Sequence, residues 1–340
     1  VGNQTSILSN STHLVDTLLS RDVKLVKVFS PEHGFRGTVS AGQKIDNSND
    51  NITGLPIVSL YGDHKKPTRQ DLKGLDLVIF DIQDVGVRFY TYISTLHYVM
   101  EACAEVGLPV LILDRPNPNG DYIDGPILEI AHKSFVGMHP VPIVHGMTIG
   151  EYALMINGER WLKDSLQCDL QILECQNYHH SMRYSLPVPP SPNLRSDISI
   201  RLYPSLCFFE GTTISVGRGT AQPFELYGHP RMDKGNFSFK PKSMMGAMYP
   251  KHLNLTCGGV NLNKEPLDSR FTLRYLLDAL SIIGDPVSTI NRKNFFVLLS
   301  GTETLYNQIV NGLSEDEIRK TWQKDLAAYR EVRARYLKYD

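Results

Sequence analysis

The chain has 340 residues, of which 41% are hydrophobic and 21% are charged, and its formal net charge at pH 7 is −1. This balance is typical of a globular protein, and it excludes the strongly basic surface with which proteins attract nucleic acids or anionic membranes. No window holds about 18 consecutive apolar residues, so no membrane span is expected. At roughly 150 residues per domain, the length predicts two domains.

The cysteines and the familiar cofactor motifs give no sign of a bound group. Five cysteines without C-x-x-C spacing argue against a zinc site and a dense disulfide framework. The sequence also lacks a phosphate-binding P-loop, a G-x-S-x-G elbow and an H-E-x-x-H zinc motif. Gly217-Arg218-Gly219 lacks the third glycine of a dinucleotide fingerprint. We therefore expect neither a cofactor nor a metal.

The first elements lead into a loop rich in reactive groups. Ser11 and Thr12 predict the start of a helix that runs to about Leu19, and residues 23–29 predict a strand. Pro31 ends this strand because it has no N–H to donate. Glu32, His33 and Arg36 follow within five residues, at the carboxyl end of the strand, where open α/β sheets bind ligands.

Strands and helices then alternate along the first half. Strands are predicted over 56–60, 75–82, 109–113 and 141–144, and helices over 68–73, 92–106 and 148–157. The run Leu77-Val78-Ile79-Phe80 is continuously apolar, as expected of a parallel strand covered on both faces. This alternation predicts a parallel sheet with helices on both faces.

The second half has a different pattern. A strand over 170–173 is followed by a proline-rich extended segment over 186–193, a glycine-rich stretch over 208–220, a helix over 271–283 and a last helix that begins at Ser314. We therefore predict an α/β fold: a Rossmann-like parallel sheet domain over residues 1–160, followed by a smaller α+β C-terminal domain over residues 161–340 that completes the cleft.

Acids and arginines recur at the predicted strand ends. The pairs are Glu32 with Arg36, Asp81 and Asp84 with Arg88, Asp114 with Arg115, and Glu210 with Arg218. Two carboxylates that flank a scissile bond are what glycoside hydrolysis requires. Each acid could instead simply pair with its neighbouring arginine. A second alternative is a metal-dependent hydrolase in which Asp81, Asp84 and Asp114 supply oxygen ligands to Mg²⁺ or Ca²⁺.

Several motifs together resemble the YbbC/NamZ family. They are Ser30-Pro-Glu-His-Gly-Phe-Arg-Gly37, Leu60-Tyr-Gly62, Phe80-Asp-Ile-Gln-Asp-Val-Gly-Val-Arg-Phe-Tyr-Thr-Tyr-Ile93, Leu113-Asp-Arg-Pro-Asn-Pro118, His145-Gly-Met-Thr-Ile-Gly-Glu151, Pro190-Ser-Pro-Asn193, Glu210-Gly-Thr212 and Gly217-Arg-Gly-Thr220. The resemblance implies a Rossmann-like domain, a smaller C-terminal domain and a cleft between them. It also implies an exo-β-N-acetylmuramidase that releases N-acetylmuramic acid from the non-reducing end of peptidoglycan fragments.

The resemblance places the family's acidic catalytic candidate on Glu32, beside His33. We expect Glu32 to act as general acid, held protonated by partial burial against Phe35 and the cleft wall. Asp84 or Glu210 is the expected second carboxylate, unless the 2-acetamido group of the sugar is itself the nucleophile. A peptidoglycan-binding module without catalysis is the non-enzymatic alternative.

The remaining candidates are expected to hold the substrate. Arg88 or Arg218 would bind the lactyl carboxylate, and Tyr90 or Tyr92 would stack on the ring. The other expected substrate-binding residues are Arg36, His145 and Asn193. The partners are thus MurNAc-GlcNAc fragments of peptidoglycan. A cell-wall substrate predicts an extracytoplasmic protein, periplasmic or secreted, although the chain carries no leader that would support this independently.

Overall fold

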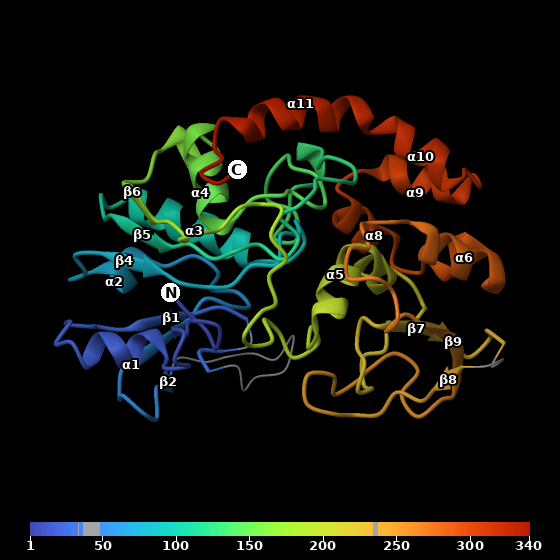
Figure 1. The fold of residues 1–340 in the computed structure, drawn as a ribbon, viewed down its shortest axis with the longest axis horizontal. Helices are drawn as coiled ribbons and strands as arrows, with labels where there is room; N and C mark the ends of the chain where they lie inside the picture. The colour runs from blue at the N-terminus through green and yellow to red at the C-terminus, as the bar shows by residue number, and fades with distance from the viewer. Residues whose placement is uncertain (33, 37–47, 234–236) are drawn as a thin grey trace.

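The computed structural model describes residues 1–32, 34–36, 48–233 and 237–340 (Figure 1). Its first layer is a sheet in two halves. In one half, β1 (Val28–Ser30) pairs in parallel with β3 (Pro56–Ser59), which also pairs antiparallel with β2 (Ser48–Asn49). In the other half, β4 (Val78–Phe80), β5 (Val110–Leu113) and β6 (Leu170–Leu173) are parallel.

The first two residues join these halves. The amide of Gly2 donates to the Phe29 carbonyl (3.0 Å), and the amide of Asp81 donates to the Val1 carbonyl (2.9 Å). The helices that alternate with the strands are α1 (Leu14–Leu19), α2 (Arg69–Leu72), α3 (Tyr92–Ala104) and α4 (Ile149–Gly158). The predicted α/β class with a Rossmann-like parallel sheet is therefore confirmed.

The second part of the chain is mixed. Strand β9 (Cys257–Asn261) pairs antiparallel with β7 (Leu226–His229) and β8 (Ser238–Phe239). Around this small sheet lie α5 (Asp197–Leu206), the 3-10 turn η3 (Cys207–Gly211), α6 (Arg274–Ile283), α7 (Pro286–Thr289), α8 (Lys293–Ser300) and α9 (Glu303–Val310). Two short 3-10 turns, η1 (Ile130–His132) and η2 (Lys163–Ser165), precede this part.

The C-terminal helices return to the first half of the chain. Helices α10 (Glu315–Thr321) and α11 (Gln323–Ala334) cross the molecule, as Figure 1 shows in red. The Tyr329 hydroxyl donates to the His145 carbonyl (2.8 Å), and the Tyr339 hydroxyl donates to the Asp114 carboxylate (2.8 Å). These bonds fix the end of the chain against the parallel sheet.

Three predicted elements differ from the structure. The first strand covers only Val28–Ser30, because Val23 and Val26 are about two-fifths exposed (41% and 39%) and not enclosed by the sheet. Residues 141–144 form only isolated bridges, in which Val144 pairs with both Val87 and Asp124. The last helix is interrupted at Trp322, which separates α10 from α11.

The division of the chain at residue 160 stays a prediction, and β6, which follows that residue, extends the first sheet through β5. All five cysteines are free thiols. Within the described ranges, no helix combines the length and apolarity needed to cross a bilayer.

Candidate active site

A cavity of about 220 Å³ lies between the end of the parallel sheet and the second part of the chain. Six of the predicted site residues line it: Glu32, Tyr90, Tyr92, Asn193, Glu210 and Arg218. These residues come from four separate segments of the chain, so the fold rather than local sequence brings them together.

Glu32 reaches the cavity from the end of β1. Because β1 and β3 are parallel neighbours, their carboxyl ends place Glu32 and Tyr61 at the same edge of the sheet. The Tyr61 hydroxyl donates to Oε1 of Glu32 at 3.0 Å. Glu32 is half-buried. The carboxyl group is thus oriented by a neighbouring strand end while it stays accessible from the cavity.

Tyr90 and Tyr92 form one wall. Their rings pack edge to face with centroids 4.9 Å apart. Tyr203 from α5 packs against Tyr90 in the same manner, with centroids 5.9 Å apart. The Tyr90 hydroxyl donates to the Pro190 carbonyl (2.8 Å), and the Tyr92 hydroxyl accepts from the side-chain amide of Asn3 (2.9 Å). Burial raises the pKa of both phenols, so both stay neutral.

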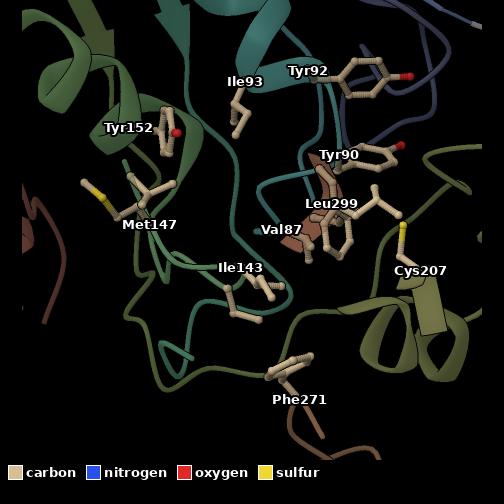
Figure 2. Close-up of a cluster of buried hydrophobic side chains, with 14 of the residues drawn as sticks. Val87, Tyr90, Tyr92, Ile93, Ile143, Met147, Tyr152, Cys207, Phe271 and Leu299 are labelled. Carbon is tan, nitrogen blue, oxygen red and sulfur yellow. The ribbon is translucent and has the colours of Figure 1, made fainter. Parts of the chain in front are cut away.

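Figure 2 shows Tyr90 and Tyr92 side by side above the apolar cluster, with Leu299 and Cys207 close to Tyr90. Leu299 and Cys207 also line the cavity. The wall is therefore aromatic and aliphatic, which is suitable for the apolar face of a sugar ring.

Glu210 also lines the cavity, from η3 directly after α5. Nε of Arg218 donates to its Oε1 at 2.7 Å. Burial alone would raise the pKa of the Glu210 carboxyl, but the charges of Arg218 and Lys251 hold that pKa below its usual value. Glu210 is therefore an ionised carboxylate at neutral pH.

Lys251 supports this carboxylate from below the lining. Its ammonium donates to the carbonyls of Phe209 and Thr212, both at 2.6 Å, which bracket Glu210 in the chain. Burial lowers the pKa of Lys251 to about 8, while the charge of Glu210 opposes the shift. At neutral pH the ammonium is thus charged and fixes the turn that carries Glu210.

The Glu210–Arg218 pair still reaches the cavity. The Arg218 side chain is 30% exposed and the Glu210 side chain 22%. The Arg218 guanidinium lies 5.1 Å above the Phe224 ring. Its two terminal nitrogens make no hydrogen bond to any residue within the described ranges, so they are available to an anionic ligand.

Comparison with known proteins agrees with this geometry. The family described as "Exo-beta-N-acetylmuramidase NamZ, N-terminal" matches residues 1–198, and the corresponding C-terminal family matches residues 201–339. The chain belongs to the NamZ family. A Bacillus subtilis (strain 168) relative, "Peptidoglycan beta-N-acetylmuramidase NamZ", is 39% identical over 363 residues, which covers 99% of this chain and 84% of the relative.

Two solved structures from Bacteroides fragilis NCTC 9343, both described as DUF1343 family proteins, share the fold. One has a TM-score of 0.92 at 47% sequence identity, and the match covers 100% of this chain and 92% of the chain in that structure. The other has a TM-score of 0.87 at 27% identity, and the match covers 100% of this chain and 93% of the chain in that structure. The two-part architecture described above is therefore that of the NamZ family.

Four of the predicted site residues lie away from the cavity, and the predicted role of Arg88 needs correction. Arg88 is fully buried. Its terminal nitrogens donate to four backbone carbonyls, those of Pro126 (2.8 Å), Val141 (2.7 Å), Leu299 (3.0 Å) and Ser300 (2.6 Å). No donor at those nitrogens is left for a lactyl carboxylate, so Arg88 ties the two parts of the chain together instead.

Arg36 also has its partners elsewhere. It forms ion pairs with Asp50 (2.7 Å) and Asp16 (3.1 Å). The ring centroid of the neighbouring Phe35 lies 4.7 Å from that of His13, and Phe35 lines a different cavity from Glu32. His33 lies outside the described residues.

Asp84 and His145 form a buried layer behind the cavity wall. Nε2 of His145 lies 3.6 Å from Oδ2 of Asp84, which also accepts from the amide of Gly86 at 2.7 Å. Both side chains are almost completely buried. Neither lines the cavity. Of the two candidates for the second carboxylate, only Glu210 is at the surface of the site.

The alternative metal site does not assemble. Asp81 is paired with Arg115 at 2.6 Å, and Asp114 accepts from Thr148 and Tyr339. Asp84 accepts from the amide of Gly86, as described. Among the described residues, no group of three or more His, Cys, Asp or Glu side chains is arranged to hold a metal ion.

Two residues that matter to the site, Tyr61 and Lys251, were not predicted from the sequence. Tyr61 follows a predicted strand, and the parallel order of the sheet would have placed it beside Glu32. No sequence pattern predicts the role of Lys251, because it precedes no recognisable motif and contacts Phe209, 42 positions away in the sequence.

Proposed function

We propose that this protein is an exo-β-N-acetylmuramidase, a glycosidase that releases N-acetylmuramic acid from the non-reducing end of peptidoglycan fragments. The observation that carries the proposal is that Glu32 and Glu210 line one cavity, together with the aromatic rings of Tyr90 and Tyr92. Two carboxyl groups around one sugar-sized space are the minimum machinery for glycoside hydrolysis. The family and the 39% identical relative support the same activity.

In this proposal Glu32 is the general acid that protonates the glycosidic oxygen as the bond to the anomeric carbon breaks. The Tyr61 hydroxyl donates to Oε1 of Glu32 and so orients the carboxyl group within the cavity. Once the leaving group has gone, the same carboxylate is available to take a proton from the incoming water, as microscopic reversibility requires for a retaining course.

Glu210 is the ionised carboxylate of the two. Because Arg218 and Lys251 keep it ionised, it suits the role of the negatively charged partner. It would stabilise the oxocarbenium-like transition state, either by direct attack or by orienting the 2-acetamido group for attack from within the sugar. A separation of about 5–5.5 Å between the two carboxyl groups in the complex would favour retention, and about 6.5–9.5 Å inversion.

Arg218 provides the preference for muramic acid. N-acetylmuramic acid differs from N-acetylglucosamine by a lactyl ether that carries a carboxylate. Arg218 lines the cavity, and its terminal nitrogens carry donors that suit a carboxylate in a bidentate arrangement. Tyr90 and Tyr92 would then supply the apolar surface for the ring. We infer from a substrate of this kind that the protein acts outside the cytoplasm, in the periplasm or secreted.

The direct test is incubation of the purified protein with a chromogenic β-N-acetylmuraminide and with the matching β-N-acetylglucosaminide, each with and without EDTA. The proposal predicts release from the muraminide, little or none from the glucosaminide, and no effect of EDTA. Binding of muramyl ligands without release over hours would instead indicate a binding module.

A further inference from the structure

An exposed apolar strip lies in the segment 243–250, between β8 and β9. Tyr249 is 90% exposed, Met245 is 67% exposed and Met248 is 50% exposed. Large apolar side chains gathered on one short surface segment are a feature of binding sites, since isolated exposed residues need no explanation but a group of them does. We refer to these three side chains as the methionine–tyrosine strip.

The middle of the segment is fixed to the cavity wall. The side-chain amide of Asn193, which lines the cavity, donates to the Gly246 carbonyl at 2.9 Å. Gly246 has a φ of +87° and packs so closely on Pro192 that a Cβ at this position would lie 2.8 Å from the Cβ of Pro192. Only glycine allows this approach without strain.

Both ends of the segment are fixed to Gly219, the residue after Arg218. The amide of Lys242 donates to the Gly219 carbonyl at 2.8 Å, and Pro250 packs directly on Gly219. Lys251 then reaches the carbonyls on either side of Glu210. The segment is thus fixed at its middle to Asn193, which lines the cavity, and at its ends to the residue next to Arg218.

The segment is also ordered within itself. Met244 and Ala247 exchange two backbone hydrogen bonds, of 3.2 and 2.9 Å, which close a tight turn around Met245 and Gly246. A surface held in this way loses little conformational freedom when it binds a ligand, which favours affinity. Figure 1 shows the segment, in orange, beneath the small antiparallel sheet and extending toward residues 186–194.

We propose that the methionine–tyrosine strip is the binding surface for the aglycone, the N-acetylhexosamine on the reducing side of the bond that is cleaved. This inference rests on the proposed function, because it needs a sugar in the cavity whose leaving group emerges beside Asn193 and Arg218. Tyr249 supplies a flat apolar face for the pyranose, and the methionines supply adaptable contacts for the acetamido methyl group.

The strip would explain how an enzyme with a small cavity distinguishes glycan fragments from simple glycosides. The cavity of about 220 Å³ holds the sugar that is released. The next sugar must therefore lie outside it, on the surface that borders the entrance. A rigid apolar surface at that position adds affinity only for substrates that carry a second sugar.

The test is calorimetry in a Glu32→Gln background, which prevents turnover. The ligands are the disaccharide MurNAc-β-1,4-GlcNAc and N-acetylmuramic acid alone. Adding Tyr249→Ala should weaken disaccharide binding about tenfold, the equivalent of about 1.4 kcal/mol, and change binding of the monosaccharide by at most about twofold. Tyr249→Phe should keep the disaccharide affinity, since stacking does not need the hydroxyl.

Ile282→Ala is the matched control, because Ile282 is 56% exposed but lies on α6. Equal weakening for both ligands, or none for either, would overturn the inference. So would a parent protein that binds the disaccharide no more tightly than the monosaccharide. Failure of the proposed function is separate: it would appear as absence of sugar release by the protein with Glu32 intact.

Discussion

Nε of Arg218 lies 2.7 Å from Oε1 of Glu210, and this ion pair borders the same cavity as Glu32. The pair gives the site one carboxylate that is ionised at neutral pH. The guanidinium beside it has two terminal nitrogens that donate to no described residue. Asp84, by contrast, lies behind the wall against His145. The two candidates for the second carboxylate are therefore distinguishable by mutation.

Glu210→Gln is expected to lower kcat on a chromogenic muraminide by about 10²–10⁴-fold, because the negative partner of the transition state is lost. Asp84→Asn is the comparison, and its loss should be smaller by at least about tenfold, since Asp84 does not touch the cavity. Thermal melts of both variants control for folding. A greater loss in Asp84→Asn, in a protein that stays folded, would contradict this assignment.

Arg218→Lys tests the selectivity for muramic acid. Lysine keeps the charge beside Glu210 but loses the planar fork that fits a carboxylate. The ratio of kcat/KM for the muraminide to that for the glucosaminide should fall by about tenfold. The ratio is its own control, because a general effect on Glu210 would lower both numbers together. An unchanged ratio would show that the lactyl group is bound elsewhere.

Arg88→Met tests the structural role assigned to that residue. Four carbonyls from the two parts of the chain would lose their donor, so the free energy of unfolding should fall by at least about 3 kcal/mol. Arg183→Met is the control, since the Arg183 side chain is 70% exposed and its pair with Asp268 spans 3.6 Å. That variant should change stability by less than about 0.5 kcal/mol, and equal effects in urea titrations would contradict the role.

A buried chain of histidines makes the fold sensitive to acid. The rings of His97 and His139 are 2.9 Å apart at their nearest nitrogens, and His139 lies 3.0 Å from the Tyr152 hydroxyl. Burial lowers the pKa of His97 to about 4, and burial together with the charge of His97 lowers the pKa of His139 well below its usual value. Both rings are thus neutral in the folded protein at pH 7.

Because these pKa values are depressed by folding, the unfolded chain binds protons that the native protein does not. The contribution of the two rings to the free energy of unfolding is therefore fully present above about pH 6.5. It falls as the pH drops toward 4, with a slope of up to about 1.4 kcal/mol per pH unit for each ring. Melting temperatures measured from pH 7.5 to 4.5 should show this fall. His97→Gln should reduce the slope, and an unchanged slope would contradict the explanation.

The sequence predicts those parts of the site that depend on strand ends. Glu32 and Tyr61 end neighbouring parallel strands, and a parallel order places such ends together. It could not predict that Arg88 points into the core, because the four carbonyls that bind it come from segments up to 212 positions away. Nor could it reveal Lys251 beneath Glu210. Contacts of that kind depend on packing between the two parts of the chain, for which no local pattern exists.

The elements that were predicted wrongly also depend on contacts between distant segments. The apolar run over 141–144 has the composition of a strand, but it forms only isolated bridges with Val87 and Asp124. The predicted last helix buries Ile318, Leu326 and Tyr329, although it breaks at Trp322. Burial patterns are thus more predictable than hydrogen-bond ladders, because burial follows from composition while ladders need a specific partner.

The most direct test of the catalytic assignment is the rate of MurNAc release from MurNAc-β-1,4-GlcNAc by the Glu32→Gln variant, with circular dichroism and a thermal melt to confirm folding. A glutamine cannot protonate the glycosidic oxygen, so the rate should fall by about 10²–10⁴-fold with the melting temperature little changed. A folded Glu32→Gln enzyme that cleaves the disaccharide at the wild-type rate would contradict the role of Glu32 and, with it, the proposed mechanism.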